Sequence, residues 1–554
     1  MFSASVRHLS FYPFVQPLAR SRARFMVEAE NGELNACELV WWKRTTPEEQ
    51  HRASMVIRLA NNYTTQWQVE MTFPGEAHYI KYGFLLTDPE GNHVWLNAYG
   101  VHPTFAVEGS FELLQINSTD LITIPEWSKG CIYYQIFPDR FARNGAVRGG
   151  LSPWDALPTR ENYLGGNLSG IIARLPYLAG LGIECVYLNP IFLGDFNHKY
   201  ATTDYLKIDP MFGTEMELID LVDQAHQLGI RVILDGVFNH TGIHFAPFMD
   251  WMEKGEGSAY KDWFYPKQYP IRLSASCYEC VGDYPYMPRL NGANPEVRKY
   301  VRDVLLYWLD RAHIDGWRFD VADELDRHAV TWWREEVKKA YPDAVMLGET
   351  WGDASRLLGA DGFDCAMNYL FRDAMIDYFA HETITEAELN ERLNSMLMRY
   401  PDDANLAMYN CLGSHDTARF LTEAKGEKWR LRLAMAFQML FPGAPAIYYG
   451  DELGMTGEND PGCRGGMTWD RQDQDLLAWE KELIQIRKAH PAVRYGSYAV
   501  VKAEDHLFAF LRESETDRLI ALFNMGNQTR HLDLAELSGS VDVQPYSVKI
   551  INPS

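Results

Sequence analysis

From residue 131 onward, short apolar runs alternate with amphipathic helical stretches. The first runs are CIYYQIFP (131–138), ECVYLNPIF (184–192) and RVILDGVF (231–238), and the helical stretches between them end at glycines. This alternation is typical of repeated βα units that build a parallel sheet. Because the pattern continues for the length of several such units, we predict an α/β fold with a (β/α)₈ TIM barrel over residues 125–490 rather than an open sheet.

Three segments depart from this pattern. Residues 1–124 contain short runs of β-branched and aromatic residues separated by turn residues, which predict an N-terminal β-sandwich. Residues 241–294 combine aromatic residues, proline and glycine without a clear period, and predict a subdomain inserted after the third barrel strand. Residues 491–554 return to strand-like runs, which predict a C-terminal antiparallel β domain.

Charge and composition exclude several classes of protein. The chain has 52 Lys and Arg against 75 Asp and Glu, a net charge of −23, which argues against a nucleic-acid or anionic-membrane partner. No apolar run reaches the ~18–20 residues of a membrane span, and the N-terminus lacks the order of a signal peptide. Only Cys277 and Cys280 form a CxxC pair, so we expect reduced thiols and a cytoplasmic protein.

Acidic and basic residues follow the ends of the predicted barrel strands. Asp235 follows the third strand, Arg318 and Asp320 follow the fourth, Glu349 follows the fifth, and Asp416 follows a later one. In a parallel barrel these ends meet at one face, where function is located. The sequence therefore predicts that carboxylates from three or more strands converge on one pocket.

Converging carboxylates have two chemical interpretations. They could hold a divalent cation, or they could form a glycosidase set of nucleophile, general acid/base and assisting acid. Arg318 shares a strand face with Asp320, so we expect it to keep Asp320 ionised and to disfavour a bound cation. Glu349 ends an apolar run, and desolvation there should raise its pKa, as a proton donor needs.

The strand ends carry a family resemblance. Four strings in order resemble the signatures of the α-amylase family of glycoside hydrolases: DGVFNH (235–240), GWRFDVADE (316–324), GETW (348–351) and GSHDTAR (413–419). QIFPDRF (135–141), YYGDELG (448–454) and DPGCRGGMTWD (460–470) extend the match. MPRLN (287–291) resembles the signature of the branch that contains neopullulanase, cyclomaltodextrinase and maltogenic amylase.

The resemblance implies a role for each site residue. Asp320 would be the nucleophile, Glu349 the general acid and base, and Asp416 the transition-state stabiliser. The implied supporting and substrate-binding residues are Arg318 beside Asp320, His240 and His415 on sugar hydroxyls, Tyr200 stacked under the sugar, Asp235 behind the site, Asp460 and Arg464 on the next sugar, and Glu324 on the acceptor side. We also expect a glucan path along Tyr200, the Trp251–Tyr265 cluster, Tyr284, Tyr286 and Trp351.

The sequence departs from the family at the loop where many relatives bind calcium. This loop reads ARNGAVRGG (142–150), and the later segment reads GGNLSG (165–170), so the usual carboxylates are missing. We therefore expect no metal and no cofactor. Ala201 in HKYATT and Asp323 in VADE also differ from the common residues of the branch, and they leave the linkage preference open.

The resemblance implies a retaining hydrolase that cleaves α-1,4-glucosidic bonds of cyclodextrins, maltooligosaccharides or pullulan, with transglycosylation as a side reaction. The alternatives are an α-1,6-directed or transferase-dominant enzyme and, less favoured, a non-catalytic sugar-binding relative. The N-terminal sandwich has two interpretations, a starch-binding module or a dimerisation arm. The branch favours the second, which predicts a homodimer through this domain.

Overall fold

The structure is a computed structural model that describes residues 5–145, 149–534, 536 and 539–552. Residues 146–148 of the loop in which we expect no calcium site lie outside the described residues. The chain divides into two compact units. The N-terminal unit contains Met1–Thr123 and Thr385–Asp403, and the barrel unit contains Ile124–Ile384 and Ala404–Ser554.

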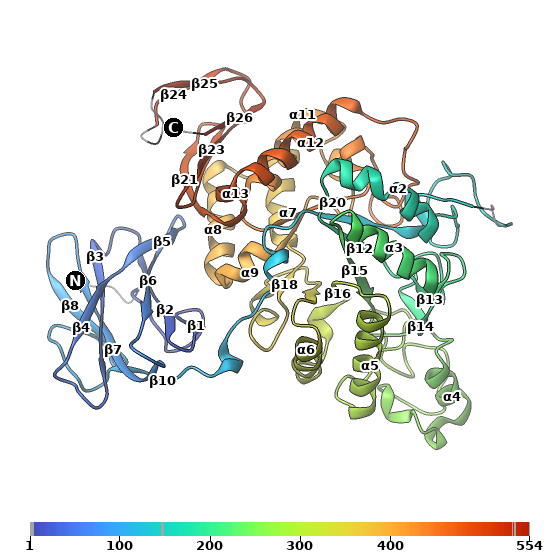
Figure 1. The fold of residues 1–554 in the computed structure, drawn as a ribbon, viewed down its shortest axis with the longest axis horizontal. Coiled ribbons are helices and arrows are strands. Elements are labelled where there is room, and N and C mark those ends of the chain that lie inside the picture. The colour runs from blue at the N-terminus through green and yellow to red at the C-terminus, as the bar shows by residue number, and fades with distance from the viewer. Residues whose placement is uncertain (1–4, 146–148, 535, 537–538, 553–554) are drawn as a thin grey trace. The chain divides into compact units, whose positions relative to one another are not determined.

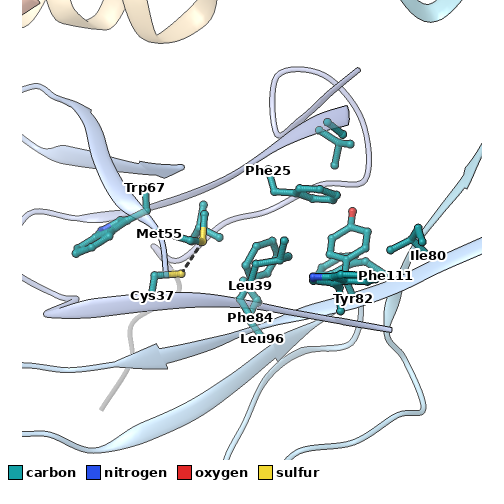
Figure 2. Packing of buried hydrophobic residues seen from close by; sticks show 14 of the residues in the cluster. Phe25, Cys37, Leu39, Met55, Trp67, Ile80, Tyr82, Phe84, Leu96 and Phe111 are labelled. Atoms are coloured by element: carbon teal, nitrogen blue, oxygen red, sulfur yellow. Dashed lines mark hydrogen bonds between the residues drawn. The ribbon is translucent and has the colours of Figure 1, made fainter. Parts of the chain in front are cut away.

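The N-terminal unit is built on two antiparallel sheets. The strands of the first sheet, in spatial order, are β1 (Val15–Ala19), β2 (Arg22–Glu30), β6 (Thr64–Thr72) and β5 (Val56–Ala60). Those of the second are β4 (His51–Ser54), β3 (Ala36–Lys43), β7 (His78–Thr87), β8 (His93–Asn97) and β9 (Gly100–His102), with β10 (Phe111–Gln115) paired to β7. Figure 2 shows the hydrophobic core of this unit, with Phe25, Tyr82, Leu39 and Phe84 among its residues. The ring centroids of Phe25 and Tyr82 are 4.8 Å apart.

A helix from far along the chain belongs to this unit. Helix α8 (Glu386–Arg399) lies in the part of the sequence that we predict as barrel, and it packs against β5. Asn61 Nδ2 donates to Ser395 Oγ at 2.9 Å, and Gln66 Nε2 donates to the carbonyl oxygen of Met398 at 3.1 Å. These hydrogen bonds satisfy polar groups of the first sheet with a segment that the sequence pattern assigns elsewhere.

Asp402, which follows α8, forms ion pairs with Arg24 and Arg58. Burial opposes ionisation of this carboxyl, but the two guanidinium groups outweigh it and lower the pKa of Asp402. We expect Asp402→Asn to reduce the free energy of unfolding by about 1–3 kcal/mol at pH 7, because two mostly buried cations lose their anion. The midpoint of urea unfolding measures this change.

A matched control is Glu76→Gln in the same unit, because Glu76 pairs with Arg20 on the surface and its loss should cost less than about 0.5 kcal/mol. The lowered pKa of Asp402 sets the direction in which its stabilising effect changes with pH. The stabilisation by Asp402 is present above the unfolded-state pKa near 3.9 and is lost as the pH falls through the lower folded-state value. If the free energies of unfolding of Asp402→Asn and wild type differ by a constant amount down to pH 2, the ion pairs do not explain the stabilisation.

The barrel unit confirms the predicted (β/α)₈ architecture. All eight strands are parallel, and a parallel bridge between Met367 and Tyr409 joins the first and last members of the sheet. In chain order the strands are β11 (Tyr133–Ile136), β12 (Cys185–Leu188), β15 (Arg231–Gly236), β16 (Gly316–Phe319), β17 (Val345–Gly348), β18 (Cys365–Ala366), β19 (Tyr409–Cys411) and β20 (Ala444–Tyr448). Every strand residue except Arg231 is buried, as expected for strands covered on both faces.

Helices follow the barrel strands and are ended by the expected local signals. Asn167 caps α2 by accepting from the backbone N–H of Gly170 at 2.7 Å, and Gly182 ends it with φ of 100°. Helix α3 contacts strand β15, and helices α5 and α6 pack against each other (Figure 1). The helices of this unit are α1 (Pro138–Phe141), α2 (Leu168–Leu181), α3 (Glu215–Gln227), α4 (Ala246–Lys254), α5 (Pro295–Arg311), α6 (Arg327–Ala340), α7 (Tyr369–Met375), α10 (Phe420–Glu423), α11 (Lys428–Leu440), α12 (Gln474–Ala489) and α13 (Pro491–Tyr495), while α9 (Asp402–Ala407) spans the boundary between the units.

Two excursions leave the barrel at its functional face. After β12 the chain forms a hairpin of β13 (Phe192–Asp195) and β14 (Ala201–Ile208), which the sequence analysis does not anticipate. After β15 it forms the inserted subdomain, which contains α4 and isolated bridges such as that between Phe264 and Leu290. Both excursions supply walls to the pocket described below.

The C-terminal part of the barrel unit is an antiparallel β domain, as predicted. Its main sheet contains β21 (Ser497–Glu504), β22 (Leu507–Glu513), β23 (Arg518–Asn524) and β26 (Ser547–Ile551), and a second pair contains β24 (Arg530–Leu532) and β25 (Val541–Val543). Among the residues that the structure describes, none of the helices has both the length and the apolar character needed to span a bilayer.

Candidate active site

A cavity of about 350 Å³ opens at the carboxyl ends of the barrel strands. Eight of the eleven predicted site residues line it: Tyr200, His240, Asp320, Glu349, His415, Asp416, Asp460 and Arg464. The lining residues that our sequence analysis does not assign to the site include Arg160, His198 and Asp323. The three predicted residues that do not line it are Asp235, Arg318 and Glu324, and their positions are described below.

Strand register brings the first two carboxylates together. Asp320 directly follows β16 and Glu349 directly follows β17, and these parallel strands pair Phe319 with Gly348. The two acids therefore leave neighbouring strands at the same height. Asp416 reaches the same pocket from the loop after β19.

Arg318 is fully buried beneath this pair and contacts three carboxylates. Its Nη1 donates to Asp235 Oδ1 at 2.9 Å and to Asp320 Oδ1 at 2.8 Å, and its Nη2 lies 2.8 Å from Glu349 Oε1. We expect from the sequence that this guanidinium keeps Asp320 ionised. The structure corrects this expectation, because one cation is shared among three acids.

The shared cation leaves the acid cluster under-neutralised. Burial and the negative charges of Glu349 and Asp235 raise the pKa of Asp320, while Arg318 opposes that rise. Burial likewise raises the pKa of Asp235 against the effect of Arg318. The single positive charge of Arg318 does not balance three carboxylates, and this imbalance favours a proton on one carboxyl beside another that is ionised.

Asp416 has a perturbed carboxyl of its own. Burial and the charge of Glu349 raise the pKa of Asp416 to about 7, and the nearby guanidinium of Arg464 opposes the rise. Arg464 Nη2 donates to Asp416 Oδ1 at 3.2 Å, and its Nη1 lies 2.8 Å from Asp460 Oδ1. Arg464 thus joins the predicted transition-state stabiliser to the predicted contact for the next sugar.

The pocket histidines are neutral hydrogen-bonding groups. Burial lowers the pKa of His240 to about 4, and burial together with Arg464 and Arg318 lowers that of His415 well below its ordinary range. Neither ring nitrogen of His240 has a hydrogen-bond partner among the described residues. Buried polar atoms of this kind in a pocket wall are available to ligand hydroxyls.

Asp235 lies behind the pocket wall, as the sequence analysis expects. It is 1% exposed, and its Oδ2 accepts hydrogen bonds from Tyr187 at 2.5 Å and from Tyr200 at 2.8 Å. Tyr200 has its ring stacked on His415, with ring centroids 5.4 Å apart. Asp235 therefore positions a wall residue and the Arg318 guanidinium and does not itself line the cavity.

Glu324 does not reach the main cavity. It lines a neighbouring cavity of about 110 Å³, where Asn239 Nδ2 donates to Glu324 Oε2 at 3.3 Å. Asp323 lines the main pocket instead. The turn after Asp320 explains why Asp323 and not Glu324 lines the main pocket, because Val321 adopts a left-handed conformation with φ of 48° and redirects the chain.

The predicted aromatic path is only partly at the surface of the pocket. Tyr284, Tyr286 and Trp351 line it, and Trp351 is 52% exposed while it stacks on Tyr369 at 4.2 Å. The Trp251–Tyr265 cluster does not line it. Trp251 is fully buried and stacks on Phe264 at 5.3 Å, so this cluster forms the core of the inserted subdomain.

Oxygen atoms of the loop in which we expect no calcium site already accept hydrogen bonds within the protein. Asn167 Oδ1 accepts from the backbone N–H groups of Asn144 and Gly170, and the carbonyl oxygen of Asn144 accepts from Asn167 Nδ2 at 2.9 Å. Within the described part of the chain, no group of three or more His, Cys, Asp or Glu residues is placed to hold a metal. The described residues of this loop do not fit a calcium ion.

Comparison with known proteins identifies the family. The model of the α-amylase catalytic domain matches residues 135–473, and that of the α-amylase N-terminal immunoglobulin-like domain matches residues 1–117. The chain belongs to the α-amylase family of glycoside hydrolases. A solved structure of a cyclomaltodextrinase superimposes on it with a TM-score of 0.92 at 35% identity and 98% coverage of both chains.

Two curated members of the α-amylase family extend the comparison. Neopullulanase 2 of Thermoactinomyces vulgaris is 39% identical over 97% of this chain and 94% of its own length. The intracellular maltogenic amylase of Bacillus subtilis is 39% identical over 85% of this chain and 82% of its own length. The branch that MPRLN (287–291) predicts is the branch in which these relatives are found.

Proposed function

We propose that this α-amylase family enzyme is a retaining hydrolase of α-1,4-glucosidic bonds in cyclodextrins, maltooligosaccharides and pullulan. The observation that carries the proposal is the Arg318 guanidinium, which holds Asp320 and Glu349 side by side at the base of the pocket. One acid of this pair can be ionised while the other holds a proton. The names and the coverage of the relatives support the substrate class.

The proposed reaction has two steps. Asp320 attacks the anomeric carbon while Glu349 gives its proton to the leaving glycosidic oxygen, so that one C–O bond forms and another breaks. Glu349, now ionised, takes a proton from water as that water attacks the same carbon and releases Asp320. Two inversions restore the α configuration. Asp416 binds the hydroxyls of the sugar at the cleavage point, and Asp460 with Arg464 binds the next sugar.

The test follows the anomeric proton by NMR during hydrolysis of γ-cyclodextrin, pullulan and maltotetraose. We expect α-anomers first, with β-anomers appearing only by mutarotation. Release of β-anomers first, or no cleavage of any of the three substrates, would rule out the proposal. Panose and isomaltooligosaccharides in the same series test the α-1,6-directed alternative. Asp323, which differs from the common residue of the branch, lies in the pocket wall and leaves this alternative open.

The raised pKa of Asp416 predicts an acidic limb in the pH profile. Because Asp416 must be ionised to accept hydrogen bonds from sugar hydroxyls, we expect kcat/KM to rise with pH through about 7. Arg464→Met removes an opposing positive charge and should move this limb to higher pH. Arg471→Met, at a surface site with the arginine side chain 71% exposed, is the control and should leave the limb in place. An Arg464→Met limb that coincides with wild type would contradict this assignment.

We also propose that the enzyme acts as a homodimer through its N-terminal unit. A run of exposed apolar side chains supports this, with Tyr99 75%, Phe105 43% and Val107 41% exposed. Sedimentation should give a dimer for wild type and a monomer for the double variant Tyr99→Ser/Phe105→Ser. A wild-type monomer at all concentrations would overturn the proposal.

We further propose that the enzyme works in the cytoplasm without a metal. The similarity to an intracellular maltogenic amylase supports the location. The hydrogen bonds that oxygens of Asn144 and Asn167 already accept support independence from calcium. Activity after dialysis against EDTA should equal the activity before it, and a loss restored by calcium would overturn this part of the proposal.

A further inference from the structure

A continuous set of buried hydrogen bonds runs behind the pocket from Asp235 to His415. From it we propose that Gln135 and Asn189 are positioning residues that hold His415 in the tautomer protonated at Nε2. The tautomer itself follows from the geometry of the protein. Its use, presenting an N–H donor to a substrate hydroxyl, rests on the proposed function.

The argument begins at Asp235. Arg318 Nη1 donates to Asp235 Oδ1 at 2.9 Å and to Oδ2 at 3.1 Å, and the hydroxyls of Tyr187 and Tyr200 both lie within 2.8 Å of Oδ2. Because both carboxylate oxygens already accept from the guanidinium, the carboxylate is the acceptor of the two tyrosine protons. Each tyrosine oxygen can then only accept from its remaining neighbours.

Asn189 is the next group. Its Nδ2 lies 3.2 Å from the Tyr187 hydroxyl and 3.0 Å from the Tyr200 hydroxyl, so the amide must turn its N–H groups toward them. Its Oδ1 therefore faces Gln135, whose Nε2 lies 3.1 Å away. An oxygen in this position requires an N–H donor, which sets the orientation of the Gln135 amide.

The orientation of the Gln135 amide determines which nitrogen of His415 is protonated. The same Nε2 lies 2.8 Å from His415 Nδ1, so Nδ1 accepts a hydrogen bond. Burial and nearby Arg464 and Arg318 lower the pKa of His415, and the neutral ring carries one proton, which must be on Nε2. Gln135 and His415 are at most 1% exposed, so water does not compete for these bonds.

The resulting donor is aimed at the pocket. His415 Nε2 lies 2.5 Å from the Tyr200 hydroxyl and 3.2 Å from Asp416 Oδ2, and both oxygens can accept from it. A sugar hydroxyl that enters here shares the His415 N–H with the Tyr200 hydroxyl and meets a carboxylate acceptor on Asp416. A hydroxyl both accepts and donates, so this pair complements it, whereas the other tautomer would offer two acceptors.

The test measures the two ring nitrogens directly. Protein labelled with ¹⁵N-histidine should show His415 with Nε2 protonated and Nδ1 unprotonated from pH 6 to 8, with the signals assigned by their loss in His415→Gln. In Gln135→Glu the new carboxylate faces Nδ1 and accepts from it, so Nδ1 should become protonated at pH 8. A wild-type proton on Nδ1, or unchanged nitrogen shifts in Gln135→Glu, would overturn the proposal.

Kinetics supply the second readout. Gln135→Leu keeps the volume but removes the donor, and we expect kcat/KM to fall about tenfold, the usual net effect of losing one hydrogen bond. The matched control is Gln438→Leu, because Gln438 is also buried in the barrel and donates two hydrogen bonds, to the carbonyl oxygens of Asn410 and Ala446. The control should lose similar thermal stability yet keep the wild-type nitrogen shifts and kcat/KM within twofold.

The two proposals fail separately. The nitrogen shifts are measured on the resting enzyme, so they report the tautomer whether or not an α-glucan is cleaved. If wild type shows the expected tautomer but hydrolyses none of the test substrates, the proposed function fails and the tautomer assignment stands. Equal loss of kcat/KM in Gln135→Leu and Gln438→Leu would count against a positioning role.

Discussion

Asp320→Asn is expected to lower kcat on γ-cyclodextrin by about 10⁴-fold or more, as the loss of a nucleophile does in other covalent mechanisms. The same change should raise the melting temperature. Asp320 is buried against Glu349 and Asp235 with a single shared guanidinium, so a neutral amide relieves repulsion that the active enzyme maintains. Activity assays and thermal unfolding of the same preparation measure both effects.

A comparison with Glu349→Gln separates the two catalytic roles. α-Maltosyl fluoride has a leaving group that needs no protonation, so Glu349→Gln should still release fluoride from it in the first step, whereas Asp320→Asn should not. On γ-cyclodextrin both variants should be severely impaired. Fluoride release by Asp320→Asn at the wild-type rate would exclude Asp320 as the nucleophile.

The second large effect is expected far from the pocket. Glu480→Gln on helix α12 should change how stability depends on pH. Glu480 is 1% exposed, and neither carboxylate oxygen has a hydrogen-bond partner among the described residues. Burial, with the charges of Glu452 and Asp451, raises the pKa of Glu480 to about 8.

The acids around Glu480 have their own partners. Glu452 accepts the hydroxyls of Tyr134 and Tyr177, and Asp451 accepts from Arg419, so no cation among these contacts is directed at Glu480. Glu480 is therefore protonated in the folded enzyme at neutral pH. In the unfolded chain the Glu480 carboxyl ionises near pH 4.5. Between that pH and about 8, this carboxyl therefore holds its proton only in the folded state.

The direction of the pH effect follows from this difference. Wild-type stability loses about 1.4 kcal/mol per pH unit from this group between pH 4.5 and 8, and Glu480→Gln removes that dependence. Relative to wild type, the variant should gain about 3–4 kcal/mol between pH 5 and pH 8 in urea unfolding. Glu482→Gln, on the exposed side of the same helix, should show no such trend. Parallel pH profiles for wild type and Glu480→Gln would contradict a buried neutral carboxyl.

The sequence predicts the site well where function follows from strand ends. Asp320 and Glu349 were found because a parallel barrel brings the residues after its strands to one face, and no side-chain detail is needed for that inference. The barrel follows from the alternation of apolar runs and helical stretches, the inserted subdomain from the interruption of that pattern, and the C-terminal sheet from the strand-like runs after it. The hairpin of β13 and β14 was missed because it lies in an irregular stretch between two regular units.

Side-chain geometry sets the limit of such prediction. Alternation along a strand places Arg318 beside Asp320, but only the three-dimensional rotamer shows that it also reaches Asp235 and Glu349. The left-handed turn at Val321, which directs Asp323 into the pocket and Glu324 away, leaves no periodic trace, since valine seldom adopts that conformation.

The N-terminal unit has a consequence for how the chain is made. Residues 1–123 emerge from the ribosome before Ile124–Ile384, and the segment Thr385–Asp403, whose helix α8 packs against their first sheet, emerges only after that stretch. Until then the groups of Arg58, Asn61 and Gln66 that bind this segment have no such partner. During synthesis this unit therefore finishes folding only after the sixth barrel strand has emerged, and a nascent chain stalled before residue 385 should keep the first sheet of the unit sensitive to protease.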